Sequence, residues 1–386
     1  MVPLFAAFGI RIGAVVGVDQ LSVAQSLRGG DELTFLHRAS DAAQLPLLGP
    51  ESLDKLTSEL HTFIFSIHYR MFDLVPPEMM LRVEMIVLAV CGIGFLSAAV
   101  YELAGPRPAL IAAWVLALEP ANIFFSSLLH KEPLMYLAEG MVAFGGAVLW
   151  KRGNLAALLP IVGGCLVAIA TRPYVGWFLT AAAAAVVLHA SLTRQRGLRS
   201  FVLTGTCLIL VFAFVPVVWE KSSSENLKQL QGSQDANFKE DANLTLEQVD
   251  YSTREKLILN LPQRISDVIL RPYVWQTDNA SQQLGAVGSL VVLVCLALLA
   301  VAIARKRRAL MPMAAPLVYP ALFMLIAYSI TAGNAGTAFR YRTHVVGLAV
   351  CLVIVLLAHR RQEQEGIAQV PPRPGFRPIH KTRTAT

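Results

Sequence analysis

The chain has 386 residues, a formal net charge of +7, 55% hydrophobic residues and only 15% charged residues. A soluble domain carries about a quarter charged residues, so this composition excludes an ordinary soluble protein and indicates membrane spans joined by loops. The positive charge is then expected in cytoplasmic loops, and we expect no binding to nucleic acid. All five cysteines fall within hydrophobic runs. They are expected to be packing residues, with no disulfide and no metal site.

The hydrophobic runs predict an all-α, polytopic transmembrane bundle of about ten spans, several of them shorter than the roughly 20 residues of an ideal span. The expected spans are 2–18, 83–104, 108–129, 133–150, 154–170, 174–190, 200–219, 286–304, 312–331 and 344–359. Arg11 interrupts the first of them, and Pro120 is expected to break the third.

Basic clusters mark every second connection between these spans. They are Arg107, Lys151 with Arg152, the Arg194–Arg199 cluster, Arg305 to Arg308, and Arg360 with Arg361. Short loops rich in Lys and Arg remain cytoplasmic. We therefore expect a multi-pass protein of the inner (plasma) membrane with both termini in the cytoplasm. The transmembrane domain is expected over residues 1–361, and a disordered cytoplasmic tail over 362–386.

The opposite, outer face carries two long loops, 19–82 and 220–285. The first contains LHTFIFSIHYRMFD (60–73), which mixes aromatic and polar residues and predicts an amphipathic helix at the membrane interface. In the second loop, apolar residues recur at regular intervals over 256–275, and this segment is expected to pack on the membrane surface.

Asp31 and Glu32 form an acidic pair in the first outer loop. Either carboxylate could act as a general base that takes a proton from an acceptor hydroxyl. The alternative is a solvated helix N-terminus, where acidic residues are favoured by the helix dipole. Two further carboxylates, Glu119 and Glu139, fall within spans, where they either pair inside the bundle or belong to a site.

Basic and aromatic residues recur together on the outer face. They are Lys131 with Glu132, Arg172 with Tyr174, Arg271 with Trp275, and Arg340, Tyr341 and Arg342. Each group alone is typical of an interfacial anchor. Together they indicate a phosphate-bearing lipid ligand, because Arg binds phosphate bidentately and aromatic rings stack on sugars or isoprenoids.

The order of these motifs resembles the GT-C membrane glycosyltransferases that use polyprenyl-phosphate sugars, such as the dolichyl-phosphate-mannose mannosyltransferases. The resemblance rests on Asp31-Glu32 with Phe35 and Ala39, on Pro120, Phe124 to Ser127 and Lys131-Glu132, and on Arg340 to Arg342. It implies an inverting glycosyltransferase of the cell envelope in which Asp31 is the catalytic base and Glu32 its neighbour. Lys131, Arg172, Arg340 and Arg342 would then contact the donor phosphate.

The expected partners are a polyprenyl-phosphate sugar donor, a glycan or lipid-linked acceptor, and membrane lipids. We expect no organic cofactor, and a requirement for a divalent cation stays open. Three alternatives also stay open: an O-antigen-type polysaccharide polymerase or ligase, a transporter, and a scaffold subunit of envelope polysaccharide synthesis. A polymerase would also use paired arginines at the outer face, but it would favour two large outer loops that carry them, and the chain has one such loop. A transporter would favour inverted repeats that the chain does not display clearly.

Overall fold

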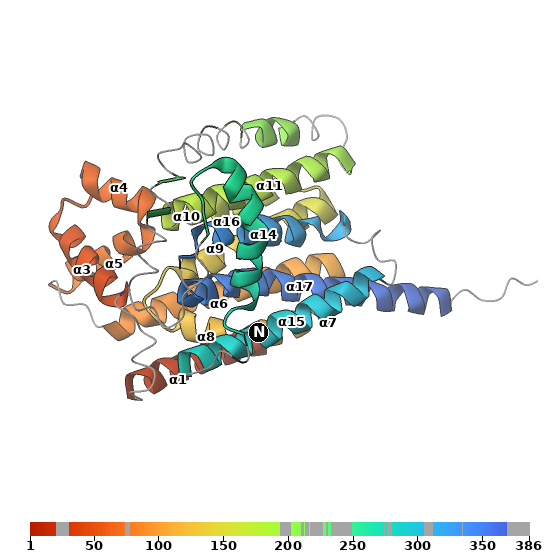
Figure 1. Cartoon of the computed structure of the whole chain (residues 1–386), viewed down its shortest axis with the longest axis horizontal. Helices are drawn as coiled ribbons and strands as arrows, with labels where there is room; N and C mark the ends of the chain where they lie inside the picture. The colour runs from red at the N-terminus through yellow and green to blue at the C-terminus, as the bar shows by residue number, and fades with distance from the viewer. Residues whose placement is uncertain are drawn as a thin grey trace, which may run out of the picture.

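The computed structural model describes residues 1–20, 31–73, 78–193, 202–209, 249–273, 280–304, 312–333 and 335–368, and scattered residues between 212 and 275. Within these residues the chain is helical and has no strand, which confirms the all-α prediction. The long helices lie side by side as a bundle (Figure 1). Three short helices gather at one end of it: α3 (Asp31–Gln44), α4 (Pro50–Ser58) and α5 (Leu60–Met71). The helix expected over 60–73 is thus present as α5.

Six helices in the described part of the chain are long and apolar enough to cross a membrane, which makes this a multi-pass membrane protein. They are α6 (Glu78–Ala104), α9 (Glu132–Arg152), α11 (Pro173–Thr193), α15 (Ala280–Ala304), α16 (Ala315–Thr331) and α17 (Ala335–Ala368). A seventh is obtained if α7 (Pro106–Leu118) and α8 (Pro120–Ser126) are counted as one broken span.

The expected number of spans, about ten, is not confirmed. The predicted spans 2–18 and 154–170 form α1 (Val2–Gln20) and α10 (Leu158–Thr171), whose apolar stretches are shorter than a full crossing. The predicted span 200–219 lies mostly outside the described residues. Hydropathy counts every apolar run, but a run crosses a bilayer only if the helix is also long enough. At the C-terminal end, α17 continues to Ala368, into the segment expected to be disordered.

The break expected at Pro120 is confirmed, and α7 and α8 meet at an angle of 62°. Glu119 lies between them in an extended conformation and caps α8. Its carboxylate accepts hydrogen bonds from the backbone N–H groups of Ala121, at 3.3 Å, and of Asn122. A buried helix start needs such an acceptor, because its first N–H groups have no partner within the helix.

Arg11, the charge within the first apolar run, is fully buried against α8. Its guanidinium donates to Ser126 Oγ at 2.7 Å and to Asn122 Oδ1 at 2.5 Å. It also donates to the carbonyl oxygens of Ala7 and Ala117. A charge in an apolar helix is therefore satisfied by protein contacts that fix α1 to the short helix α8.

Helix α9 occupies the centre of the bundle and packs against α6 and α10. Small residues permit this close approach. A Cβ on Gly92 of α6 would lie 2.7 Å from the Tyr136 carbonyl oxygen, and one on Gly140 of α9 would lie 2.8 Å from the Gly92 carbonyl oxygen. One further helix, α14 (Arg254–Leu270), runs across the long helices and packs on α15, α16 and α17 (Figure 1).

Candidate functional site

The turn between α8 and α9 lies at the end of the bundle that carries α3, α4 and α5. It ends at Lys131, after which Glu132 begins α9 and Pro133 occupies the first turn. Both choices suit a helix start: Pro has no N–H to leave unsatisfied, and a carboxylate is stabilised by the helix dipole. The side chain of Glu132 is nevertheless only 4% exposed, so its charge needs partners within the protein.

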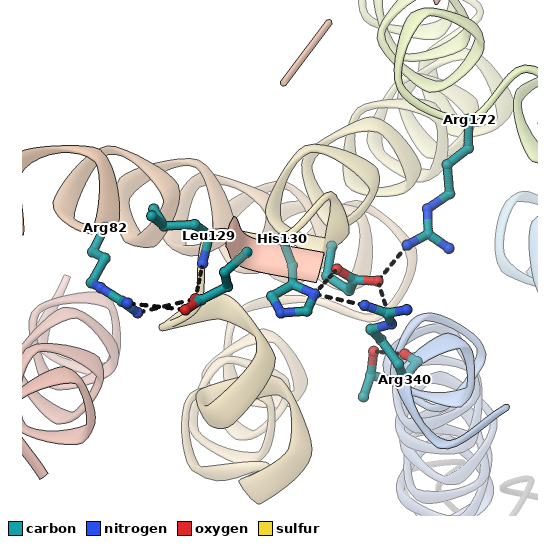
Figure 2. A network of polar contacts seen from close by, with 8 residues as sticks. Arg82, Leu129, His130, Arg172 and Arg340 are labelled. Atoms are coloured by element: carbon teal, nitrogen blue, oxygen red, sulfur yellow. Dashed lines mark hydrogen bonds and ion pairs between the residues drawn. The ribbon is translucent and has the colours of Figure 1, made fainter. Parts of the chain in front are cut away.

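Three side chains from different elements converge on the Glu132 carboxylate (Figure 2). Arg172, which follows α10, donates a hydrogen bond to Oε1. Arg340 of α17 brings its Nε within 3.4 Å of the same oxygen, and His130 Nδ1 lies 3.7 Å from Oε2. Arg340 also donates from Nη1 to His130 Nδ1 at 2.7 Å, which requires that nitrogen to be unprotonated. We call Lys131, Glu132, Arg172, Arg340 and His130 the basic cluster.

Arg172 uses only part of its hydrogen-bonding capacity. Its side chain is 10% exposed, and its Nε and Nη1 have no hydrogen-bond partner within the described residues. One face of the guanidinium lies 4.5 Å from the centre of the Tyr341 ring, which in turn stacks on Tyr328 of α16 at 4.6 Å. The aromatic pair fixes the orientation of the guanidinium.

Lys131 lies on the α3–α5 side of the basic cluster, with Nζ 5.4 Å from the Phe35 ring centre. Burial, and then the nearby charge of Arg172, lower the pKa of Lys131 to about 8. His61 of α5 packs edge-on against the same phenyl ring, at 4.6 Å. Burial and the charges of Lys131 and Arg172 lower the pKa of His61 well below its usual value. Both shifts include repulsion between positive charges, so the electrostatic potential here favours an anion.

Glu32 belongs to a neighbouring ion pair and not to the basic cluster. Its carboxylate receives two hydrogen bonds from Arg82 of α6, at 3.2 and 3.1 Å, and one from the backbone N–H of Leu129 at 2.7 Å (Figure 2). Arg82 also donates to the carbonyl oxygen of Ser127. This network ties the start of α3 to the turn that carries Lys131. Asp31 is the first residue of α3, and its side chain lies outside the described part of the structure.

Of the residues expected to bind substrate, the structure brings Lys131, Glu132, Arg172, Arg340 and Tyr341 together. Tyr174 is 49% exposed at the start of α11. Arg271 pairs with Asp267 at 3.0 Å and lies over Tyr273, on which the exposed Trp275 stacks at 4.9 Å. These residues form a separate aromatic group after α14.

Arg342 is 2% exposed and faces away from Arg340. It donates to Ser289 Oγ at 2.8 Å and to the carbonyl oxygens of Ile269, Arg271 and Gly285. Its contacts join α17 to α14 and α15. Arg342 thus holds helices together, and none of these hydrogen bonds goes to a residue of the basic cluster.

Four residues important at this end of the bundle were not among the predicted site residues: His130, Arg82, His61 and Tyr328. Only His130 carried a usable signal, because it directly precedes Lys131-Glu132 in the sequence. Among the described residues, no three His, Cys, Asp or Glu side chains lie together in an arrangement that could hold a metal ion. Comparisons with known protein families, with curated proteins and with solved structures find no match to this chain.

Proposed function

We propose that the chain is a membrane glycosyltransferase that binds the phosphate of a polyprenyl-phosphate sugar in the basic cluster. The observation that carries this proposal is the buried guanidinium of Arg172 beside Lys131 and Arg340, with two nitrogens that find no acceptor among the described residues. Arginine suits bidentate phosphate binding, and burial strengthens its interaction with an anion.

The chemistry would proceed as follows. The bond between the sugar C1 and the phosphate oxygen breaks, and a bond forms between C1 and an acceptor hydroxyl oxygen. Asp31 takes the hydroxyl proton, and the polyprenyl phosphate leaves with one more negative charge than it carried as a diester. Cations fixed beside the phosphate stabilise that extra charge more in the transition state than in the bound donor, which accelerates the reaction.

Two features support Asp31 as the base. It begins α3, and its neighbour Glu32 is bonded to the backbone of Leu129, two residues before Lys131. Glu32 itself is engaged by Arg82, which leaves Asp31 as the better candidate of the pair. The acceptor would be a glycan or a lipid-linked glycan.

We further propose that the basic cluster faces the outside of the inner (plasma) membrane. Helix α9 carries Glu132 at its first residue and Lys151 and Arg152 at its last turn. Such a basic pair at a span end favours the cytoplasm, which directs the opposite end of α9 outwards.

The test is sugar transfer from a panel of radiolabelled polyprenyl-phosphate sugars by the full chain in nanodiscs. We expect transfer by the unaltered chain, its loss in Asp31→Asn, and at least tenfold slower transfer in Arg172→Ala. Arg152→Ala, at the far end of α9, is the matched control and should retain activity. Transfer that survives both Asp31→Asn and Arg172→Ala would contradict the proposed site.

A further inference from the structure

Glu139 of α9 and His344 of α17 are an acid and a base buried together inside the bundle. Both side chains are 0% exposed, and His344 Nδ1 lies 3.4 Å from Glu139 Oε2. Neither carboxylate oxygen and neither ring nitrogen has a hydrogen-bond partner in the described part of the chain. An ionisable group within a span is costly, and a pair that shares one proton keeps a net charge of zero.

The surroundings of this pair are largely aromatic. The His344 ring stacks on Tyr328 of α16, with centres 5.5 Å apart, and lies 6.1 Å from the Tyr136 ring of α9. The titratable or charged groups near the pair are Tyr136, Tyr328, Cys351, Glu132 and Arg172. Arg11 and Glu119 act electrostatically on Tyr136, and Cys295 acts on Cys351. Each member of the pair makes its ion-pair contact with the other member.

His344 connects the pair to the basic cluster. A small cavity of about 10 Å³, with room for one water molecule, is lined by both His344 and Glu132. Asn122, Ser126, Tyr136 and Thr343 supply polar groups to the same cavity. Glu139 lies about two turns, roughly 10 Å, further along α9 from Glu132. Of the pair, His344 is thus the member next to the basic cluster.

We propose that Glu139 and His344 form a buried proton-binding site whose proton moves to His344 when negative charge accumulates at the basic cluster. In this step the O–H bond of Glu139 breaks and an N–H bond forms at His344 Nδ1, so one proton is relocated and no other reactant is needed. A negative charge at the cluster stabilises the nearby imidazolium more than it disfavours the more distant carboxylate.

This inference rests on the proposed function for the origin of that charge. Departure of the sugar adds one negative charge to the phosphate held by Arg172 and Arg340. Movement of the proton towards His344 would bring a compensating positive charge to the inner side of the cluster, through a part of the protein that water does not reach freely. Glu139 and His344 then support sugar transfer without touching the donor.

The test is infrared spectroscopy of the full chain in nanodiscs, with Glu139→Gln used to assign the protonated-carboxyl C=O band of Glu139. Glu132→Gln removes one negative charge beside His344, so it should increase this band. Glu102→Gln, at the other end of the bundle, is the control and should leave it unchanged. An unchanged band in Glu132→Gln would overturn the proposal, whether or not the cluster binds anions.

Addition of sulfate, which has no proton of its own to exchange near neutral pH, should decrease the Glu139 band in the unaltered chain. Sulfate binding is measured separately by calorimetry. If sulfate binds and the Glu139 band does not change, the proposed proton movement is also overturned. Absence of sulfate binding would count against the proposed anion site alone, because the Glu132→Gln comparison still tests the proton movement between Glu139 and His344. If Glu139→Gln does not fold, ¹⁵N-histidine resonances assigned with His344→Gln report the same proton from the imidazole side.

Discussion

Arg172 donates a hydrogen bond to Glu132 across a separation of 40 residues, and both side chains are almost fully excluded from solvent. The pair joins the α10–α11 turn to the first turn of α9. Glu132 accepts from one nitrogen of the guanidinium, and the other two have no partner among the described residues. Lys131 lies near enough for the charge of Arg172 to lower its pKa. The carboxylate therefore orients Arg172 without using all of its capacity to bind an anion.

Replacement of Arg172 should weaken anion binding. Each charge-assisted hydrogen bond contributes about 1.5–3 kcal/mol, so we expect Arg172→Ala to lower sulfate affinity by about ten- to a hundredfold. Arg172→Lys keeps the charge but loses the planar fork and should recover only part of the affinity. Isothermal titration calorimetry in nanodiscs measures both effects. Arg152→Ala, which disrupts an exposed pair with Glu102, should bind sulfate normally, and an equal loss there would point to a general electrostatic effect.

The pH dependence of sulfate binding should report Lys131. Its pKa is lowered to about 8 by burial and by Arg172, so its charge is present below pH 8 and is lost above it. Sulfate affinity should therefore fall as the pH rises through about 8, by the order of tenfold for one nearby charge. Lys131→Gln should bind weakly with little change over this range, whereas Lys131→Arg should bind well on both sides of pH 8. A fall in affinity that persists unchanged in Lys131→Gln would assign the titration to another group.

The meeting of Lys131, Arg172 and Arg340 could be anticipated from sequence. Each lies at the end of an apolar run, on the face opposite the Lys- and Arg-rich connections expected in the cytoplasm. Because successive spans alternate in direction, they bring such ends to one face. Glu132, the common partner of Arg172 and Arg340, was also identifiable, since it adjoins Lys131 in the sequence. The contacts between them depend on how α9, α10 and α17 pack, which periodicity alone does not specify.

The direction of the Arg342 side chain could not be predicted from the order of the spans. The last predicted span was expected to begin at 344, which left Arg340 and Arg342 together in a turn. The structure begins α17 at Ala335, so both arginines lie within a helix, where residues two apart point to nearly opposite sides. Arg340 consequently reaches Glu132, and Arg342 reaches the carbonyl oxygens after α14. Likewise, the partner of Glu32 is Arg82, 50 residues away, and no local pattern identifies it.

Arg82→Ala should strongly destabilise the protein. It would remove both hydrogen bonds that Arg82 donates to the buried Glu32 carboxylate. Loss of one member of a buried pair costs about 3–5 kcal/mol, which should appear as a clear fall in Tm by fluorescence-detected unfolding in detergent. Lys55→Ala removes a partly exposed pair with Glu59 and should change stability by about 1 kcal/mol or less. A Tm for Arg82→Ala equal to that of Lys55→Ala would refute a structural role for the Arg82–Glu32 pair.

Gly92→Ala should disturb both the bundle and the basic cluster. The new Cβ would lie 2.7 Å from the carbonyl oxygen of Tyr136, which belongs to the backbone of α9 and cannot rotate away. Overpacking of this kind costs about 1–3 kcal/mol, and it should displace the first turns of α9, including Glu132. We therefore expect a lower Tm together with weaker sulfate binding. Gly13→Ala is the matched control, because nothing lies within 4 Å of its Cβ and alanine favours a helix, so its Tm should stay the same or rise. Normal stability and normal sulfate binding in Gly92→Ala would mean that the spacing of α6 and α9 does not position Glu132.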